Sequence, residues 1–323
     1  MSTADDRASS ASGTAEQQAA ELLGSDVREG YAEVGDQRLH YVEAGEGPLV
    51  VLLHGFPEFW YGWRLQIQPR AAAGFRVVAP DTRGYNLSSK PDGVKAYDSG
   101  LLAADIVGLI HERGAESASL VGHDWGGTIA WAMAMNHPEV VDRLAILNAA
   151  HPRKLSQGLH HPGQLRKSWY FFFFDLPDLP EAVVHADRWH FFRHFLRAAR
   201  PAYTPEEMDR YVEAWSQPGA STGMINYYRC SVRTPPKQAE AAIHPVSAPT
   251  LVIGTICGCR AASAGMTGGA VITAVNGKAV GSPDDLASIL SRFHPGDTIS
   301  VTWVSPSGQR TTRSLHLAAG PPQ

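Results

Sequence analysis

The sequence contains few cysteines and no second cluster of metal-ligating side chains. Its 323 residues include Cys230, Cys257 and Cys259, which are too few and too unevenly placed for a disulfide framework. Cys257 and Cys259 could in principle be two ligands of a metal ion. No further group of Cys and His with ligand spacing accompanies them, so we expect neither a metal nor another cofactor.

Long apolar runs and an excess of one charge are also missing. No segment approaches the ~20 apolar residues of a membrane span, since the longest aromatic run covers only 170–174. The formal net charge of −4 gives no electrostatic reason to expect nucleic acid or a membrane surface as a partner. Residues 1–25 are rich in Ser, Ala and Gln and lack the apolar centre of a signal peptide. We therefore expect a disordered tail and a cytoplasmic protein.

The composition is that of a folded protein, with 44% hydrophobic and 19% charged residues. Over residues 26–150, short apolar runs alternate with helical patterns, the latter at 101–112 and 126–136. This alternation predicts an α/β core with a mostly parallel sheet covered on both faces. The expected strands are Leu39–Val42, Leu49–Leu53, Arg76–Ala79, Ala118–Val121 and Leu144–Leu147.

Residues 151–245 have a different texture, in which Pro, His and aromatic residues are frequent and helices replace strands. A capping box at Thr204–Glu207, with Pro at the first helical position, predicts the start of one helix. A helical insertion of this kind is typical of a lid. Residues 246–256 then return to the core as its last strand.

The final segment, 257–323, cannot continue such a sheet. It predicts a hairpin about Asn276-Gly277, a helix over 283–293, and two further strands at 298–304 and 310–317. A hairpin, helix, hairpin order indicates a separate small β/α module.

Residues 122–126, Gly-His-Asp-Trp-Gly, lie between an expected strand and an expected helix. This context predicts a nucleophile elbow, a sharp turn that exposes one side chain above the sheet. The exposed residue would be Asp124, a carboxylate that attacks carbon without a base and leaves an ester. Asp124 could instead be only a helix N-cap. His123 is expected to pack or hydrogen-bond rather than to act as a base.

The segment His54-Gly55-Phe56-Pro57 follows another expected strand. The backbone amides of Phe56 and Trp125 would together form an oxyanion hole beside the nucleophile. The alternative is a plain strand-ending turn. In the turn that follows the next expected strand, we expect Arg83 to form an ion pair rather than to bind a ligand.

Residues from about 30 to 255 resemble an epoxide hydrolase of the α/β-hydrolase fold. The resemblance implies that Tyr170 and Tyr228, on the lid, hold and protonate the epoxide oxygen, although either could be lid packing. A small hydrophobic epoxide is the implied substrate. A haloalkane dehalogenase-like enzyme is the alternative, but a halide leaves without a proton. The motifs that carry the resemblance are His54-Gly55-Phe56-Pro57-Glu58, Asp81-Thr82-Arg83-Gly84-Tyr85-Asn86, Gly122-His123-Asp124-Trp125-Gly126-Gly127, the stretch Trp169–Pro177 and Asn226-Tyr227-Tyr228-Arg229.

The same resemblance implies a catalytic acid after the strand at 250–253 and a catalytic His after one further strand. Residues 254–260 contain no Asp or Glu, and we expect His294 and His316 to be structural residues of the final module. The predicted enzyme thus forms its ester but is impaired in turnover. The core is predicted to be an incomplete α/β-hydrolase whose last strand exposes apolar surface.

Residues 261–317 resemble the latter part of a PDZ domain of HtrA-type serine proteases. Such domains bind peptide C-termini beside one of their own strands. The strand and loop that do so would lie upstream, where this chain still resembles a hydrolase, so the PDZ-like module is expected to be partial. A non-catalytic peptide-binding protein and a truncated fusion product remain alternatives. The carrying residues are Ala264-Gly265-Met266, Gly269-Ala270-Val271-Ile272, Val275-Asn276-Gly277-Lys278 and His294-Pro295-Gly296-Asp297.

Overall fold

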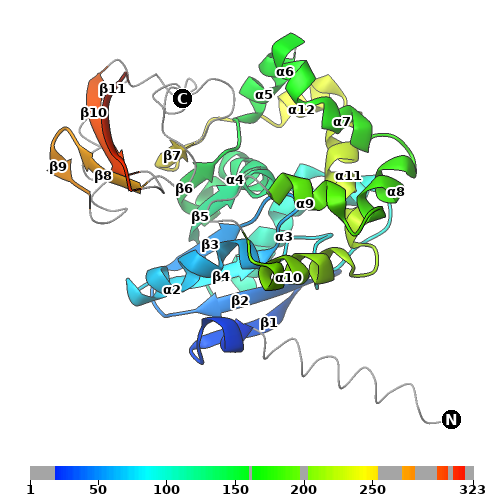
Figure 1. The fold of residues 1–323 in the computed structure, drawn as a ribbon, viewed down its shortest axis with the longest axis horizontal. Coiled ribbons are helices and arrows are strands. Elements are labelled where there is room, and N and C mark those ends of the chain that lie inside the picture. The colour runs from blue at the N-terminus through cyan, green and yellow to red at the C-terminus, as the bar shows by residue number, and fades with distance from the viewer. Residues whose placement is uncertain are drawn as a thin grey trace.

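A seven-stranded sheet forms the centre of the molecule (Figure 1). The computed structural model describes residues 19–159, 162–196, 203–253, 271–280, 297–304 and 308–316. The strand order is β1-β2-β4-β3-β5-β6-β7, with the first two strands antiparallel to their neighbours and the others parallel. The strands are β1 (Val27–Val34), β2 (Gln37–Ala44), β3 (Leu49–Leu53), β4 (Arg76–Pro80), β5 (Ala118–His123), β6 (Val141–Leu147) and β7 (Thr250–Ile253).

The predicted mostly parallel sheet is confirmed, and each predicted core strand lies in an observed one. Every residue of β3 is buried, because a central parallel strand is covered on both faces and is therefore apolar throughout. Strand β1 was missed. Its sequence mixes Arg, Glu and Gly with apolar residues, and it becomes a strand because all eight of its residues pair with β2.

Two helices that follow strands lie against the sheet and against each other: α3 (Ser99–Glu112) and α4 (Trp125–Asn136). Helix α3 begins where the Asp98 carboxylate accepts a hydrogen bond from the Gly100 amide at 2.9 Å. Helix α4 is apolar on nearly all sides because it lies between the sheet and α3. Helix α2 (Arg64–Ala72) packs on β4 and β2, and short 3-10 helices cover Trp60–Trp63 and Val94–Tyr97.

The insertion between β6 and β7 is helical, as predicted, and several hydrogen bonds and ion pairs fasten it to the core. The Tyr227 hydroxyl donates to the Arg83 carbonyl at 2.6 Å, the Trp215 indole donates to the Pro57 carbonyl at 2.6 Å, and Arg64 pairs with Glu207. The predicted capping box at Thr204 is confirmed. The lid helices are α5 (Pro152–Leu159), α6 (Pro162–Lys167), α7 (Trp169–Phe174), α8 (Leu179–His185), α9 (His190–Leu196), α10 (Pro205–Trp215), α11 (Ala220–Arg233) and α12 (Pro236–Ala241).

The predicted disordered tail is wrong for its last seven residues. Residues 19–23 form a helical turn whose Ala19 is fully buried, and its backbone amide donates to the Glu29 carboxylate at 3.1 Å. Leu22 and Leu23 pack against the core. These apolar side chains of an otherwise polar segment thus pack on the core, a contact that could not be predicted from the sequence. The rest of the predicted tail, residues 1–18, lies outside the described residues.

The final segment forms a second, antiparallel sheet of order β11-β10-β8-β9. Its strands are β8 (Val271–Val275), β9 (Lys278–Ala279), β10 (Thr298–Val304) and β11 (Arg310–His316). Asn276 and Gly277 have φ of 47° and 77°, as the predicted two-residue hairpin turn requires. The alternation on β10 is confirmed, since Ile299, Val301 and Trp303 are buried. The predicted helix over 283–293, the two late cysteines and His294 lie outside the described residues, and the PDZ resemblance stays a prediction.

Strand β7 ends the order of the first sheet and carries exposed apolar side chains. Val252 is 54% exposed and Ile253 is 37% exposed. The expected apolar surface at this strand is therefore present. Among the described residues, no helix is long and apolar enough to cross a membrane.

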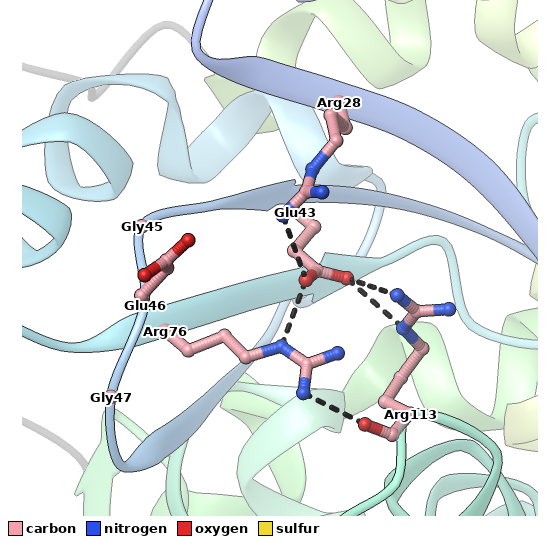
Figure 2. A pocket seen from close by; sticks show the side chains of 7 residues that line it. All are labelled: Arg28, Glu43, Gly45, Glu46, Gly47, Arg76 and Arg113. Carbon is pink, nitrogen blue, oxygen red and sulfur yellow. Dashed lines mark hydrogen bonds and ion pairs between the residues drawn. The ribbon is translucent and has the colours of Figure 1, made fainter.

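A charged hollow of about 360 Å³ lies at the amino ends of β3 and β4, the side of the sheet opposite the predicted elbow. Figure 2 shows Glu43 between two arginines, and its carboxylate accepts from Arg76 at 2.8 Å and from Arg113 at 3.0 Å. Arg28 approaches the same carboxylate at 3.7 Å. Glu43 is only 2% exposed, so these arginines compensate a buried charge and tie β2 to β4 and to the end of α3.

A second buried cluster joins β1, β2 and the loop after β4. The His40 ring lies between Asp81, at 2.7 Å from Nδ1, and Glu29, at 2.8 Å from Nε2. Asp81 also accepts from the backbone amide of Trp60 at 3.0 Å. Burial disfavours the charged ring, but the two carboxylates outweigh it and raise the pKa of His40 to about 9.

This cluster predicts a loss of stability in alkali. The folded-state pKa of His40 exceeds its unfolded value near 6.5, so its contribution is complete below pH 6.5 and disappears as pH rises through about 9. We expect the free energy of unfolding to fall by up to about 3 kcal/mol over this range, measured by urea denaturation. His40→Gln should abolish the decline, whereas substitution of the exposed His111 by Gln should preserve it. If the free energy of unfolding falls with pH equally in His40→Gln and in the unaltered protein, this interpretation is refuted.

Candidate active site

Asp124 lies at the turn between β5 and α4 in a strained backbone conformation, with φ 51° and ψ −117°. Non-glycine residues rarely adopt such angles unless the surrounding structure imposes them. The Asp124 side chain makes no capping hydrogen bond to α4, so the alternative of a simple helix N-cap is wrong. The predicted sharp turn is present and presents the carboxylate beyond the carboxyl end of the strand.

Three glycines allow the turn because the backbone passes too close for a side chain. A Cβ on Gly122 would lie 2.4 Å from the Gly126 carbonyl oxygen, and one on Gly126 would lie 2.2 Å from the Leu53 carbonyl oxygen. A Cβ on Gly55 would lie 2.5 Å from the Asp124 Cβ. The strand, the helix and the loop after β3 thus meet at a single point, and only glycine fits at the contacts.

The loop after β3 points a backbone donor at the Asp124 carboxylate. The Phe56 amide donates to Asp124 Oδ1 at 3.0 Å, so this segment is not a plain strand-ending turn. Trp125 is the first residue of α4, where helical amides lack intrahelical partners. His54 braces the loop, since its Nε2 accepts from the Thr82 amide at 3.1 Å and its Nδ1 lies 3.0 Å from the Gly55 carbonyl. Burial lowers the pKa of His54, as suits a neutral brace.

The two predicted lid phenols lie close to each other and to these residues. Tyr170 is on α7 and Tyr228 on α11, with ring centroids 5.7 Å apart. The Tyr228 ring is 5.1 Å from that of Trp125 and 5.0 Å from that of Phe56. Burial, together with the charge of Asp124, raises the pKa of Tyr170 to about 12 and that of Tyr228 well above 10. Both phenols therefore keep their protons at neutral pH.

An acid–base pair beside Asp124 was not predicted. His123 Nδ1 lies 3.2 Å from a Glu58 carboxylate oxygen, and the Tyr203 hydroxyl donates to the other oxygen at 3.3 Å. Burial opposes both charges, but the hydrogen bond and mutual attraction raise the pKa of His123 and lower that of Glu58. The contact with Glu58 thus favours the charged form of the ring. His123 is a hydrogen-bonding residue, as expected, but its partner could not be found without the fold.

Tyr85 is a further buried phenol that sequence reasoning placed only in a turn. Its ring packs edge-on against His54 at 4.7 Å and Tyr227 at 5.3 Å. Its hydroxyl makes no hydrogen bond to any described residue. Burial is the main cause that raises the Tyr85 pKa well above its usual value, and the Asp124 charge adds to it.

The expectation for Arg83 is confirmed. Its guanidinium donates to both oxygens of the Asp105 carboxylate, at 2.7 and 2.6 Å, and also to the Ala96 carbonyl at 2.7 Å. This bidentate pair fastens the loop after β4 to α3. Among the described residues, no group of three or more His, Cys, Asp and Glu side chains is arranged to hold a metal ion.

A carboxylate at a strand–helix turn, a facing backbone donor and an aromatic helical lid over a mostly parallel sheet are features of the α/β-hydrolase fold. A family profile of the alpha/beta hydrolase fold matches residues 48–220. The AB hydrolase superfamily protein YfhM of Bacillus subtilis is 48% identical over 196 residues, which are 59% of this chain and 68% of that protein. Epoxide hydrolase A of Mycobacterium tuberculosis is 34% identical over 254 residues, covering 67% of this chain and 78% of that one.

A mutant epoxide hydrolase from Bacillus megaterium, solved with its naphthyloxy-propanediol product, superposes with a TM-score of 0.63 at 31% identity. The superposition covers 70% of this chain and 82% of the Bacillus megaterium chain. The chain belongs to the epoxide hydrolases of the α/β-hydrolase family. It spans only 58–64% of the length of several animal epoxide hydrolases that it matches.

The close approach at the elbow predicts a strong effect of one methyl group. Gly126→Ala places a Cβ against the Leu53 carbonyl oxygen, so the free energy of unfolding should fall by about 1–3 kcal/mol. Chemical denaturation measures the change. Gly163→Ala, in α6 where a Cβ meets no atom within 4 Å, should instead raise stability by about 0.5–1 kcal/mol. Equal effects of the two substitutions would show that the elbow is not tightly packed.

Proposed function

We propose that this chain opens small hydrophobic epoxides through a covalent ester on Asp124. The observation that carries the proposal is the elbow carboxylate, held by the Phe56 amide at 3.0 Å close to two lid phenols, the buried Tyr228 and the partly buried Tyr170. A carboxylate is already ionised at neutral pH and needs no base to attack carbon. The phenols are weak acids that can donate a proton without first being ionised.

The proposed first half-reaction uses only described residues. An Asp124 oxygen attacks one epoxide carbon, and the bond from that carbon to the ring oxygen breaks. The freed oxygen takes a proton from Tyr170 or Tyr228, and solvent later restores the phenol. When water attacks the ester carbonyl, the amides of Phe56 and Trp125 would stabilise the oxyanion of the tetrahedral intermediate.

We propose that the second half-reaction is slow. The sequence offers no carboxylate at 254–260, directly after β7, where the family resemblance implies the acid. His123 is close to Asp124 and has Glu58 behind it, but the contact with Glu58 raises the pKa of the ring and so favours its protonated form. A protonated imidazole cannot accept a proton from water, and general-base assistance contributes typically ~10²–10⁴-fold.

The alternative of a haloalkane dehalogenase-like enzyme is less well supported. The curated relatives include several named epoxide hydrolases, and the Bacillus megaterium structure holds a diol product. Two phenols beside the nucleophile suit a leaving oxygen that must be protonated, which a halide does not require. The product of that relative also suggests that an aryl-substituted epoxide is a reasonable first substrate to test here.

Intact-mass spectrometry tests the covalent step. After exposure to styrene oxide at neutral pH, we expect one adduct per chain, located on Asp124 by peptide mapping and absent from Asp124→Ala. Product should form at well below ~1 s⁻¹ after this first turnover. His123→Gln should leave the adduct lifetime unchanged because a protonated ring does not act as base. A longer adduct lifetime in His123→Gln, or fast turnover in the unaltered protein, would contradict the proposal that hydrolysis of the ester is slow.

The lid phenols should control the rate of alkylation. We expect a roughly tenfold or larger loss for Tyr170→Phe and for Tyr228→Phe, and about 10²–10⁴-fold for the double variant. Because the pKa of Tyr170 is about 12 and that of Tyr228 is well above 10, the rate should stay level from pH 7 to 10. Tyr31→Phe, on β1, serves as the matched control. An unchanged rate of alkylation in the double variant would show that both phenols only pack within the lid.

A further inference from the structure

The lid presents an apolar surface to solvent that the proposed reaction does not use. Nine large hydrophobic side chains of the described residues are exposed, and five of them fall within 165–179. We call these five the outer lid patch. Its members are Leu165 (41% exposed), Trp169 (53%), Phe172 (50%), Leu176 (44%) and Leu179 (50%).

The outer lid patch follows helical spacing. Its members are separated by four, three, four and three residues, which is helical spacing in the sequence. Ser168, with φ −94° and ψ 17°, separates α6 from α7, although its amide still donates to the Gln164 carbonyl at 2.9 Å. Trp169 and Phe172 share one face of α7, Leu165 lies on α6, and Leu179 begins α8.

The opposite face of α7 is already occupied. Phe174 is fully buried, Phe171 stacks on Trp125 at 6.4 Å, and Tyr170 packs against Tyr228. Helix α7 is thus apolar on two sides, one that closes the candidate site and one that faces solvent. Packing against the core explains the first side but not the second.

Basic side chains border the outer lid patch, whose last members lie beside Asp175 and Asp178. Arg153 and Lys154 on α5, and Arg166 and Lys167 on α6, are all exposed. The sequence contains no Asp or Glu from 143 to 174, although the whole chain carries a net charge of −4. In Figure 1, α5, α6 and α7 form an outer edge of the molecule.

We propose that the outer lid patch docks on an anionic lipid surface. Exposed Trp, Phe and Leu beside Lys and Arg are typical of helices that lie in a membrane interface. Protein interfaces are also enriched in Trp, Phe and Arg, but they are depleted in Lys, and two of the four basic side chains here are Lys154 and Lys167. The net charge of the chain led us to expect no membrane partner, but the charge that matters is that of α5 and α6. Near an anionic surface each basic side chain contributes about fivefold to binding.

Vesicle sedimentation of the full-length protein tests the docking. We expect binding to vesicles of phosphatidylglycerol and phosphatidylcholine, little binding to phosphatidylcholine alone, and at least a tenfold loss in 1 M salt. Trp169 should be quenched by brominated lipid. Trp169→Ser/Phe172→Ser and Arg166→Glu/Lys167→Glu should each lose at least tenfold in affinity.

The controls distinguish binding through the outer lid patch from non-specific hydrophobic binding to vesicles. Leu65→Ser removes a 61% exposed leucine on α2 and should bind as the unaltered protein does. Circular dichroism and melting temperature verify that each variant is folded. Equal binding by the unaltered protein and both double variants would overturn the proposal, as would an equal loss in Leu65→Ser. Self-association through the patch, seen by sedimentation velocity without vesicle binding, would also overturn it.

Discussion

The close contact of three backbone segments at Asp124 is the constraint on which the candidate site depends. The end of β5, the start of α4 and the loop after β3 approach within distances that only Gly122, Gly126 and Gly55 permit. That approach imposes the strained φ and ψ of Asp124 and brings the Phe56 amide to its carboxylate. Strain of this kind costs of order 1–3 kcal/mol and persists only where surrounding structure enforces it. The sheet and two helices supply that enforcement.

The lid completes the site by changing its surroundings rather than by adding charge. Aromatic rings of α7, α9 and α11 surround the Phe56 side chain, with centroids 5.0–5.6 Å away. Burial among these rings raises the pKa values of the lid phenols, which keeps them as proton donors. Buried hydrogen bonds from Trp215 and Tyr227 fix the lid on the core loops. The packing of the lid therefore determines both where Tyr170 and Tyr228 lie and that their hydroxyls stay protonated.

The part of the chain around Asp124 and the part around β7 differ in how well they are packed. Asp124 and the Phe56 amide lie in the well-packed part, whereas β7, where the sheet order ends, exposes Val252 and Ile253. Beside Asp124, the contact between His123 and Glu58 raises the pKa of the imidazole and lowers that of the carboxyl, so each favours the charged form of the other. The small antiparallel sheet that follows packs its own apolar face, with Val301 and Trp303 buried, and contributes no described residue to the candidate site.

Much of this arrangement follows from local sequence. Continuous apolar runs determine β3 and β4, the pair Asn276-Gly277 determines its hairpin, and glycines flanking Asp124 determine the elbow, because each depends on backbone conformation or period. Other features depend on residues far apart in the chain. Strand β1 and the buried turn at 19–23 exist through pairing and packing, and Glu58 meets His123 across 65 residues. The sequence by itself determined most of the core strands and the sharp turn at Asp124. Only the tertiary structure decided burial, partners and pKa values, because these depend on which distant side chains share a low-dielectric space.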